Sequence, residues 1–298
     1  ETKTVDYRLG NVRSTQAAKG EWQTIVEIKR IDEGIMPVEV KLTFADGSKA
    51  VQRWNGQERT GTLTFNTASK PARVVLDSQD QIMDKSRMGH GNMRVELYPE
   101  YPRMWNYSPN NAYVLTWKPS AWYNDIDGAR VGVKFKGSYL DRKNLEVGAW
   151  YGVKSQTLDG SFNFSDKLGS QTRYHLAVMK LEGRYQADVS ISTSLSKMLF
   201  TPPQWNFRFG FNYFELPFDK AEYAATTVEV KDDVVALPNW TPGKVNRAYL
   251  NFNVNPRGMV WRSFIRGQIA HANESFGSDA TYTRIEGELR FWIPVANN

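Results

Sequence analysis

The feature that most constrains the fold is a strict alternation of apolar and polar residues in the C-terminal part of the chain. In 205–213, Trp205, Phe207, Phe209, Phe211 and Tyr213 alternate with Asn206, Arg208, Gly210 and Asn212. Successive side chains of a β-strand point to opposite faces, so this period of two predicts a strand with one apolar and one polar face. Residues 129–298 hold about nine such segments of roughly ten residues, the length that crosses a bilayer when tilted.

The two faces of these predicted strands differ in chemistry. The face that we expect to meet lipid carries Val131, Val133, Phe135, Phe207, Phe209, Phe211, Leu289 and Phe291. The opposite face, which we expect to line a lumen, carries Arg130, Lys134, Arg208, Arg284, Glu286, Glu288 and Arg290. Full burial of such charges in a dry core would cost several kcal/mol each, so they must lie in water or in a paired network.

Aromatic residues stand near the ends of several apolar faces, as Tyr151, Trp205 and Tyr213 do. Membrane β-barrels carry aromatic girdles at these positions. We therefore expect an antiparallel, transmembrane β-barrel over 129–298. A strand count near nine is odd, and single-chain bacterial barrels have even counts, so the barrel is expected to be incomplete.

Residues 1–85 alternate in the same way, but in shorter segments. Val38, Val40, Leu42 and Phe44 share one face of 37–45, and turn signals such as Asp46-Gly47 separate the segments. About seven short strands of this kind predict an antiparallel, immunoglobulin-like β-sandwich. The fold class expected for the chain is therefore all-β, and Trp54 is expected to pack in the core or at an edge of the sandwich.

Composition excludes several classes of protein. The 298 residues contain no cysteine and only three histidines, His90, His175 and His271. Thiolate metal sites, disulfides and cysteine nucleophiles are therefore absent, and no two histidines are close enough in sequence for a helical zinc pair. The net charge of +6 comes from Lys and Arg that are spread singly. We therefore expect no nucleic-acid partner, no cofactor and no bound metal.

Residues 86–128 differ from the flanking regions, because aromatic residues are interleaved there with proline. The segment holds Tyr98, Tyr101, Trp105, Tyr107, Tyr113, Trp117, Trp122 and Tyr123. Its Pro and Asn content argues against long regular elements, so a bridge between two domains is expected. A glycan- or peptide-binding surface is the alternative for these rings.

Isolated polar residues give weaker signals. His90 lies between two glycines and is expected to be a solvated loop residue. Residues 124–128 place three oxygen-bearing side chains before Gly128, but a calcium loop would need a closing Glu, so a plain turn is favoured. Residues 217–243 read as a long external loop. His271, Glu274 and Asp279 could bind a metal in principle, yet solvated side chains are the expectation.

The sandwich segment resembles a module of a known enzyme family. The pattern Val5-Asp6-Tyr7, 34–40, Asp46-Gly47, Trp54-Asn55-Gly56 and 75–77 with Asp84 looks like the β-sandwich behind the catalytic part of membrane alanyl aminopeptidases. In that family the zinc site is a His-Glu-x-x-His helix with a downstream Glu, and this chain has no such motif. The resemblance therefore implies a non-catalytic tail module.

The strand-rich segment resembles a second family. Tyr123-Asn124-Asp125-Ile126-Asp127-Gly128, followed by 130–133, looks like the entry into surface-antigen-type outer-membrane barrels. The segments 181–184 and 284–294 fit the same pattern. The resemblance covers 123–294 and implies a location in the bacterial outer membrane, with the sandwich in the periplasm or at the cell surface.

Together these features predict a non-catalytic outer-membrane barrel with a β-sandwich tail, acting in anchoring or complex assembly. The expected domains are 1–85, a bridge at 86–128 and a barrel over 129–298. The expected partners are outer-membrane lipid, other envelope proteins and the rest of its own polypeptide. Two alternatives remain open: the tail of an active zinc aminopeptidase whose catalytic domain lies outside this chain, and a soluble glycan-binding β protein.

Overall fold

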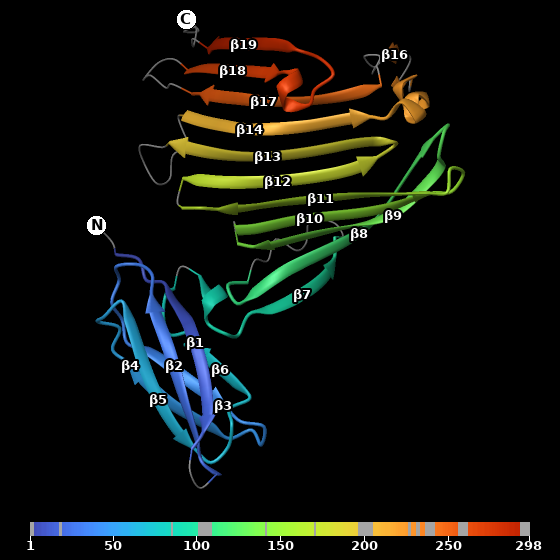
Figure 1. Cartoon of the computed structure of the whole chain (residues 1–298). Coiled ribbons are helices and arrows are strands. Elements are labelled where there is room, and N and C mark those ends of the chain that lie inside the picture. Colours follow the sequence, from blue (N-terminus) through green and yellow to red (C-terminus); the bar gives the residue numbers. More distant parts are fainter. Residues whose placement is uncertain are drawn as a thin grey trace, which may run out of the picture. The chain divides into compact units, whose positions relative to one another are not determined.

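The computed structural model describes residues 3–17, 20–84, 86–100, 109–140, 142–169, 171–195, 205–225, 228–230, 233–235, 242–255 and 262–292. The protein is all-β, with strands and a few short 3-10 turns, as the alternation predicts (Figure 1). It divides into two compact units, Glu1–Glu96 with Asn106–Val114, and Leu97–Trp105 with Leu115–Asn298. Among the described residues, no helix has the length and hydropathy needed to cross a membrane.

The first unit is a sandwich of two three-stranded antiparallel sheets. One sheet has the order β1 (Tyr7–Gln16), β2 (Trp22–Arg30), β5 (Thr60–Thr67), and the other β4 (Lys49–Trp54), β3 (Val38–Thr43), β6 (Arg73–Leu76). Six strands thus build it among the described residues, one fewer than the sequence suggested. The Asp46-Gly47 hairpin between β3 and β4 is confirmed, and Gly47 has the positive φ of 82° that such a turn favours.

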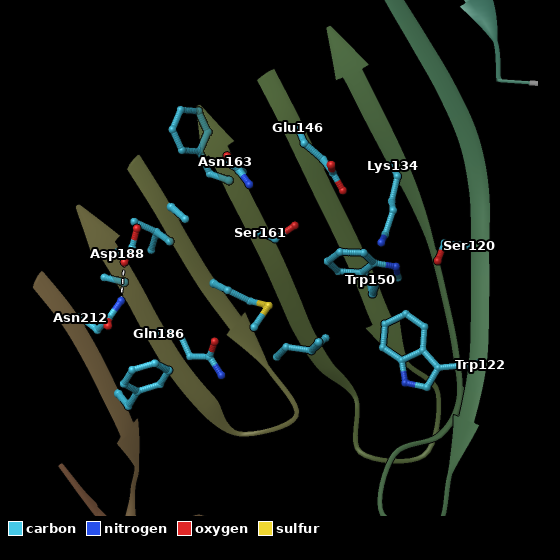
Figure 2. A pocket seen from close by; sticks show the side chains of 17 residues that line it. Ser120, Trp122, Lys134, Glu146, Trp150, Ser161, Asn163, Gln186, Asp188 and Asn212 are labelled. Carbon is cyan, nitrogen blue, oxygen red and sulfur yellow. Dashed lines mark hydrogen bonds between the residues drawn. The ribbon is translucent and has the colours of Figure 1, made fainter. Parts of the chain in front are cut away.

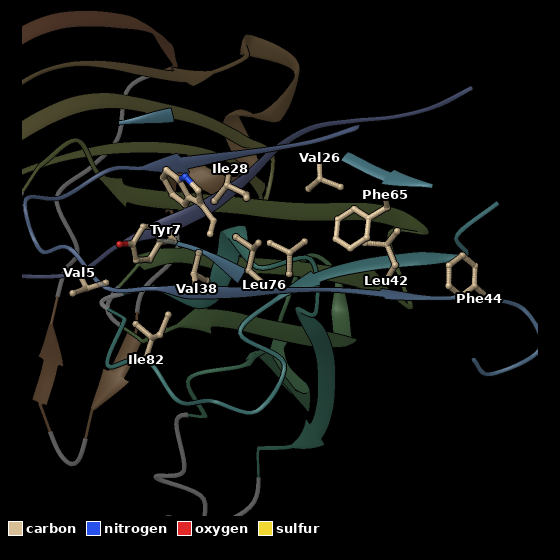
Figure 3. Close-up of a cluster of buried hydrophobic side chains, with 12 residues drawn as sticks. Val5, Tyr7, Val26, Ile28, Val38, Leu42, Phe44, Phe65, Leu76 and Ile82 are labelled. Atoms are coloured by element: carbon tan, nitrogen blue, oxygen red, sulfur yellow. The ribbon is translucent and has the colours of Figure 1, made fainter. Parts of the chain in front are cut away.

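The apolar faces of the two sheets meet in one core. Val26 and Ile28 of one sheet and Val38, Val40 and Leu42 of the other are fully buried (Figure 3). Trp54 lies in the same core, as expected. Fully burying an aliphatic side chain of this size contributes about 1.5–3 kcal/mol, so the sandwich has a self-contained source of stability.

The segment after β6 belongs to the sandwich unit. The 3-10 turn η2 (Arg87–Gly89) places Arg87 3.2 Å from the carboxylate of Asp77, and both side chains are buried. His90 is fully buried and lies 2.7 Å from Asp84, so the prediction of a solvated loop histidine is wrong. Asp84 also accepts a hydrogen bond from the main chain of Tyr7 in β1. A domain that ended at residue 85 would therefore contain the buried carboxylates of Asp77 and Asp84 but not their partners, Arg87 and His90.

The second unit is built around a large, twisted sheet. Its order is β19-β18-β17-β14-β13-β12-β11-β10-β9-β8-β7, eleven strands in the part of the chain that the structure describes. Their bounds are β7 Arg94–Pro99, β8 Ala112–Asn124, β9 Gly128–Tyr139, β10 Arg142–Gly152, β11 Thr157–Lys167, β12 Thr172–Leu181, β13 Arg184–Leu195, β14 Trp205–Leu216, β17 Gly243–Val254, β18 Arg262–Ala272 and β19 Tyr282–Trp292.

The predicted bridge is only in part irregular. β8 runs for 13 residues through Trp117, Pro119 and Trp122, so the expectation that Pro and Asn exclude long regular elements there is wrong. Pro119 is tolerated because its backbone nitrogen points to the β7 side of β8, where no strand among the described residues pairs beyond Trp117. The residues 101–108, with Tyr101, Trp105 and Tyr107, lie outside the described residues.

The sheet is open. Each strand from β9 to β19 pairs antiparallel with its neighbour in register, but β19 has a strand on one side only in the described part of the chain. The open edge agrees with the expectation of an incomplete barrel. Nine of the eleven strands, β9–β14 and β17–β19, fall in the range where about nine were expected, and the other two, β7 and β8, come from the predicted bridge.

The connections at one end of the sheet are tight turns. Glu182 and Gly183, with φ of 51° and 70°, join β12 to β13 in a two-residue hairpin. The longer connection after β14 holds the 3-10 segment η3 (Phe218–Ala225) and the short hairpin β15 (Val228–Val230) and β16 (Asp233–Val235). The turn η4 (Glu274–Phe276) precedes β19.

Candidate lipid-facing surface and polar face

The registers place one set of side chains on a single face of the sheet. One row runs from Gly137 in β9 to Thr283 in β19 through Leu145, Phe164, Leu176, Val189, Phe211, Ala248 and His271. Residues two positions along each strand lie on the same face. All eight residues expected to face lipid share this face, which we call the apolar face.

The apolar face is uncovered across the sheet. Phe209 is 59% exposed, Leu289 59% and Ile285 75%. Val131, Phe211 and Phe291 are exposed as well, whereas Val133, Phe135 and Phe207 are half-buried against their neighbours on the same face. Soluble monomers rarely expose contiguous apolar patches larger than a few hundred Å², and larger patches are typical of surfaces that contact lipid or another protein.

The opposite, polar face carries every residue expected to line a lumen. Near its middle, four strands contribute to a cluster around Asp188 of β13. Arg208 of β14 and Tyr249 of β17 each donate a hydrogen bond of 2.7 Å to this carboxylate, and His175 of β12 lies 2.9 Å away. The charge of Asp188 is therefore neutralised inside the sheet's concave side rather than left to water alone.

The charges of β19 are arranged differently. Arg284 pairs with Glu286, and Arg290 pairs with Glu288, each two residues apart on the same strand. Both pairs lie within β19, whose outer edge has no neighbouring strand in the described region. Lys134, in β9, lies 5.3 Å from the ring centre of Trp150.

A second network, which we call the clasp, consists of Asp127, Arg130, Asp159 and Tyr223. Arg130 is fully buried, donates from Nε to Asp127 at 2.7 Å and forms an ion pair with Asp159. Asp159 also accepts a 2.7 Å hydrogen bond from the main chain of the Glu182 turn. Arg130 thus lies on the polar face of β9, where we expected it to line a lumen. Its side chain, however, is fully buried in a network of ion pairs.

Tyr223 joins distant parts of the sheet. It comes from η3, after β14, and its hydroxyl donates a 2.7 Å hydrogen bond to Asp127 in the turn between β8 and β9. The main-chain carbonyl of Tyr223 accepts from Arg184 of β13. Since five strand spacings separate β9 from β14, the contact requires η3 to fold over the polar face, so 217–243 is not wholly an external loop.

The clasp changes the titration of its members. Burial alone would raise the pKa of Asp127, but the hydrogen bonds it accepts, first of all from Arg130, outweigh burial and hold that pKa well below its usual range. Burial, followed by the hydrogen bond to Asp127, raises the pKa of the Tyr223 phenol. At neutral pH the clasp therefore holds an ionised carboxylate and a neutral phenol.

A cavity of about 590 Å³ lies over the polar face between these two networks. Figure 2 shows Trp122, Trp150, Lys134 and Glu146 at one side of it and Asp188 at the other. The indole of Trp122 is fixed by a 3.0 Å hydrogen bond from Nε1 to Glu182. The lining combines charged and amide side chains with tryptophan and with aliphatic residues such as Met179 and Leu181.

Other residues singled out in the sequence have plain structural roles. Residues 124–128 form a turn in which Asn124 Oδ1 accepts hydrogen bonds from two following main-chain groups, so the plain-turn prediction is confirmed. His271 contacts the Thr283 hydroxyl at 2.9 Å, and Asp279 accepts from the main chain of Lys244 at 2.6 Å. Across the described ranges, no group of three or more His, Asp or Glu is arranged to hold a metal.

No family model, curated protein or solved structure matches this chain. The aminopeptidase and surface-antigen resemblances therefore stay predictions.

Proposed function

We propose that the eleven-stranded sheet inserts into a lipid bilayer through its apolar face and anchors the sandwich to a bacterial outer membrane. The observation that carries the proposal is the row structure of the apolar face, which stays exposed from β9 to β19 while the polar face is paired internally. In water, a sheet of this kind buries its apolar face against a second layer, as the sandwich does.

The dimensions of the apolar face fit a bilayer. Trp205 and Tyr213 mark the two ends of the face on β14. The eight residue steps from Trp205 to Tyr213 span roughly 26 Å along the strand, which becomes about 20 Å across the membrane at the tilt usual for barrels. Outer-membrane barrels present an apolar band of about 25 Å between aromatic girdles, so the spacing supports insertion.

The role of the inserted sheet is anchoring or complex assembly, without catalysis by this chain. The sandwich carries its own core and its own buried ion pairs, which suits a module held at the membrane surface. Its partners are the lipid of the bilayer and other envelope proteins or further parts of its own polypeptide.

Two adjacent residues of β11 provide a matched test. Phe162 lies on the apolar face and Asn163 on the polar face, next to Glu146 of β10. An Arg on the lipid side near the midplane costs about 2–4 kcal/mol, whereas one on the inner side costs far less. Phe162→Arg should therefore abolish flotation of the protein with liposomes, and Asn163→Arg should leave it intact.

Equal flotation of the two variants would contradict the proposal. The same holds for a wild-type protein that stays monomeric and soluble without detergent, since the soluble two-domain alternative predicts that behaviour.

A further inference from the structure

Two strand edges have no neighbouring strand in the part of the chain that the structure describes. One is the outer edge of β19. The other is residues 118–124 of β8, because β7 ends at Pro99 and its last hydrogen bond to β8 runs from the Glu100 N–H to the Trp117 carbonyl. In a bilayer each unpaired main-chain group costs several kcal/mol, so two such edges cannot both face lipid.

The directions of these two strands allow them to pair. The bonds Arg94 N–H to Asn111 and Glu100 N–H to Trp117 join residues at one constant offset, so β7 runs parallel to β8. From β8 to β19 there are ten strands, each antiparallel to the next. An even number makes β8 and β19 antiparallel to each other, as ring closure in an antiparallel barrel requires.

The hydrogen-bonding phase also matches. The Trp117 carbonyl points to the β7 side of β8, so the main-chain groups of residues 119, 121 and 123 point to the same free edge. Hydrogen-bonded and non-hydrogen-bonded pairs alternate along each row of an antiparallel sheet. When this alternation is followed strand by strand from β8 to β19, the main-chain groups of the odd-numbered residues of β19 point to its own free edge.

Successive strands are shifted along their axes, and a barrel needs such a shift in order to close. The row that starts at Gly137, near the C-terminal end of β9, reaches Thr283, near the N-terminal end of β19, although both strands run in the same direction. Closing a ten-stranded ring with an offset of roughly twelve residues gives a tilt of about 40°, from a rise of about 3.3 Å and a spacing of about 4.8 Å. That tilt lies within the usual range for barrels.

The side chains favour this offset. It sets Tyr123, which is 70% exposed, opposite Gly287, around which a Cβ would meet nothing within 4 Å. The sheet already uses such pairs, because the Phe252 ring lies against Gly267 of the neighbouring strand. An offset two residues shorter would set Lys118 opposite Arg290, and directly opposed like charges are destabilising.

We propose that residues 118–124 of β8 pair antiparallel with 286–292 of β19 in the membrane and close ten strands into a barrel, with Ala121 opposite Leu289 and β7 outside the ring. This closure rests on the proposed bilayer insertion. It encloses the clasp and the Asp188 cluster on the inner side and leaves the apolar face outside.

The cysteine-free chain permits a direct test. The full-length variant Ala121→Cys with Leu289→Cys, reconstituted in liposomes and treated with a mild oxidant, should form an intramolecular disulfide. The cross-linked chain is detected as a faster-migrating monomer on a non-reducing gel. The matched control, Ala121→Cys with Thr283→Cys, places the thiols several residues apart along the strand. It should cross-link at least roughly tenfold more slowly, because a disulfide cannot bridge Cα atoms more than about 7 Å apart.

Liposome flotation of the same samples separates the two proposals. A protein that does not float contradicts bilayer insertion whatever its disulfide state. A protein that floats but forms no disulfide overturns the closure, as does one that cross-links equally in the control or only between two chains.

Discussion

The sandwich and the large sheet use the same residue pattern with opposite outcomes. In the sandwich, apolar faces such as Val38-Val40-Leu42 are fully buried, because a second sheet lies against them. The large sheet has an equally regular apolar face, but its side chains are exposed: Phe209 is 59% and Ile285 75% exposed. Alternation thus predicts a strand with two unlike faces, while the presence or absence of a second layer decides what the apolar face must contact.

The polar sides of the two units also differ. The sandwich buries a few polar side chains, among them Thr24 and the pairs that Arg87 and His90 form with Asp77 and Asp84. The large sheet pairs charges across several strands, as the Asp188 cluster and the clasp show. In a water-soluble layer the apolar face is buried and the polar face is exposed. The large sheet shows the reverse, because its charges are paired in networks and its apolar face is exposed.

The largest expected effect tests whether the sandwich is self-sufficient. A fragment ending at residue 85 loses Arg87 and His90 and leaves Asp77 and Asp84 buried without them. Removing one partner of a buried pair costs about 3–5 kcal/mol, so this fragment should be far less stable than one ending at residue 93. Urea unfolding of the two fragments measures the difference, and equal midpoints would contradict the assignment of 86–91 to the sandwich.

A pair of leucine truncations compares the two apolar faces directly. Leu42→Ala opens a cavity in the sandwich core and should lower the free energy of unfolding by about 2–5 kcal/mol. Leu250→Ala, on the apolar face of β17 where Leu250 is 37% exposed, leaves no cavity and should change stability by less than about 1 kcal/mol. Thermal unfolding in detergent micelles reports both, and a large loss at Leu250 would show that a protein layer covers this face.

Removing one hydroxyl tests the clasp. Tyr223→Phe deletes the hydrogen bond to the ionised Asp127 carboxylate without changing the ring. Hydrogen bonds to charged groups contribute about 1.5–3 kcal/mol, so the melting temperature of the large sheet should fall while that of the sandwich stays unchanged. Loss of stability in both units would contradict a clasp confined to the sheet.

The pH dependence of stability tests the carboxylate of the clasp. The pKa of Asp127 is lowered by folding, so its contribution is complete above the unfolded value of about 3.9 and is lost as the pH falls through the folded value. Asp127→Asn should therefore be less stable than the wild type near neutral pH, and the gap should narrow below about pH 4. A stability difference between the two proteins that stays constant down to acid pH would show that the ionised Asp127 carboxylate does not stabilise the fold.

Much of this fold could be predicted from local pattern alone. The strands of 205–213 and 283–292 and their two faces follow from the period of two, and Asp46-Gly47 gives a hairpin. The clasp could not be predicted, because Tyr223 stands in a loop without periodicity and reaches Asp127 only through the curvature of the sheet. His90 between glycines gave no sign of burial, since its partner Asp84 is placed by the tertiary fold.

The contact between the apolar face and lipid is tested most directly by spin labels along β14. The cysteine-free chain allows single cysteines from Trp205 to Tyr213, each carrying a nitroxide, in protein reconstituted in liposomes. Collisions with oxygen, which concentrates in lipid, should peak at 207, 209 and 211, and collisions with a water-soluble nickel complex should peak at 206, 208 and 210. Oxygen accessibility that does not alternate, or that peaks at the even positions, would contradict insertion through the apolar face.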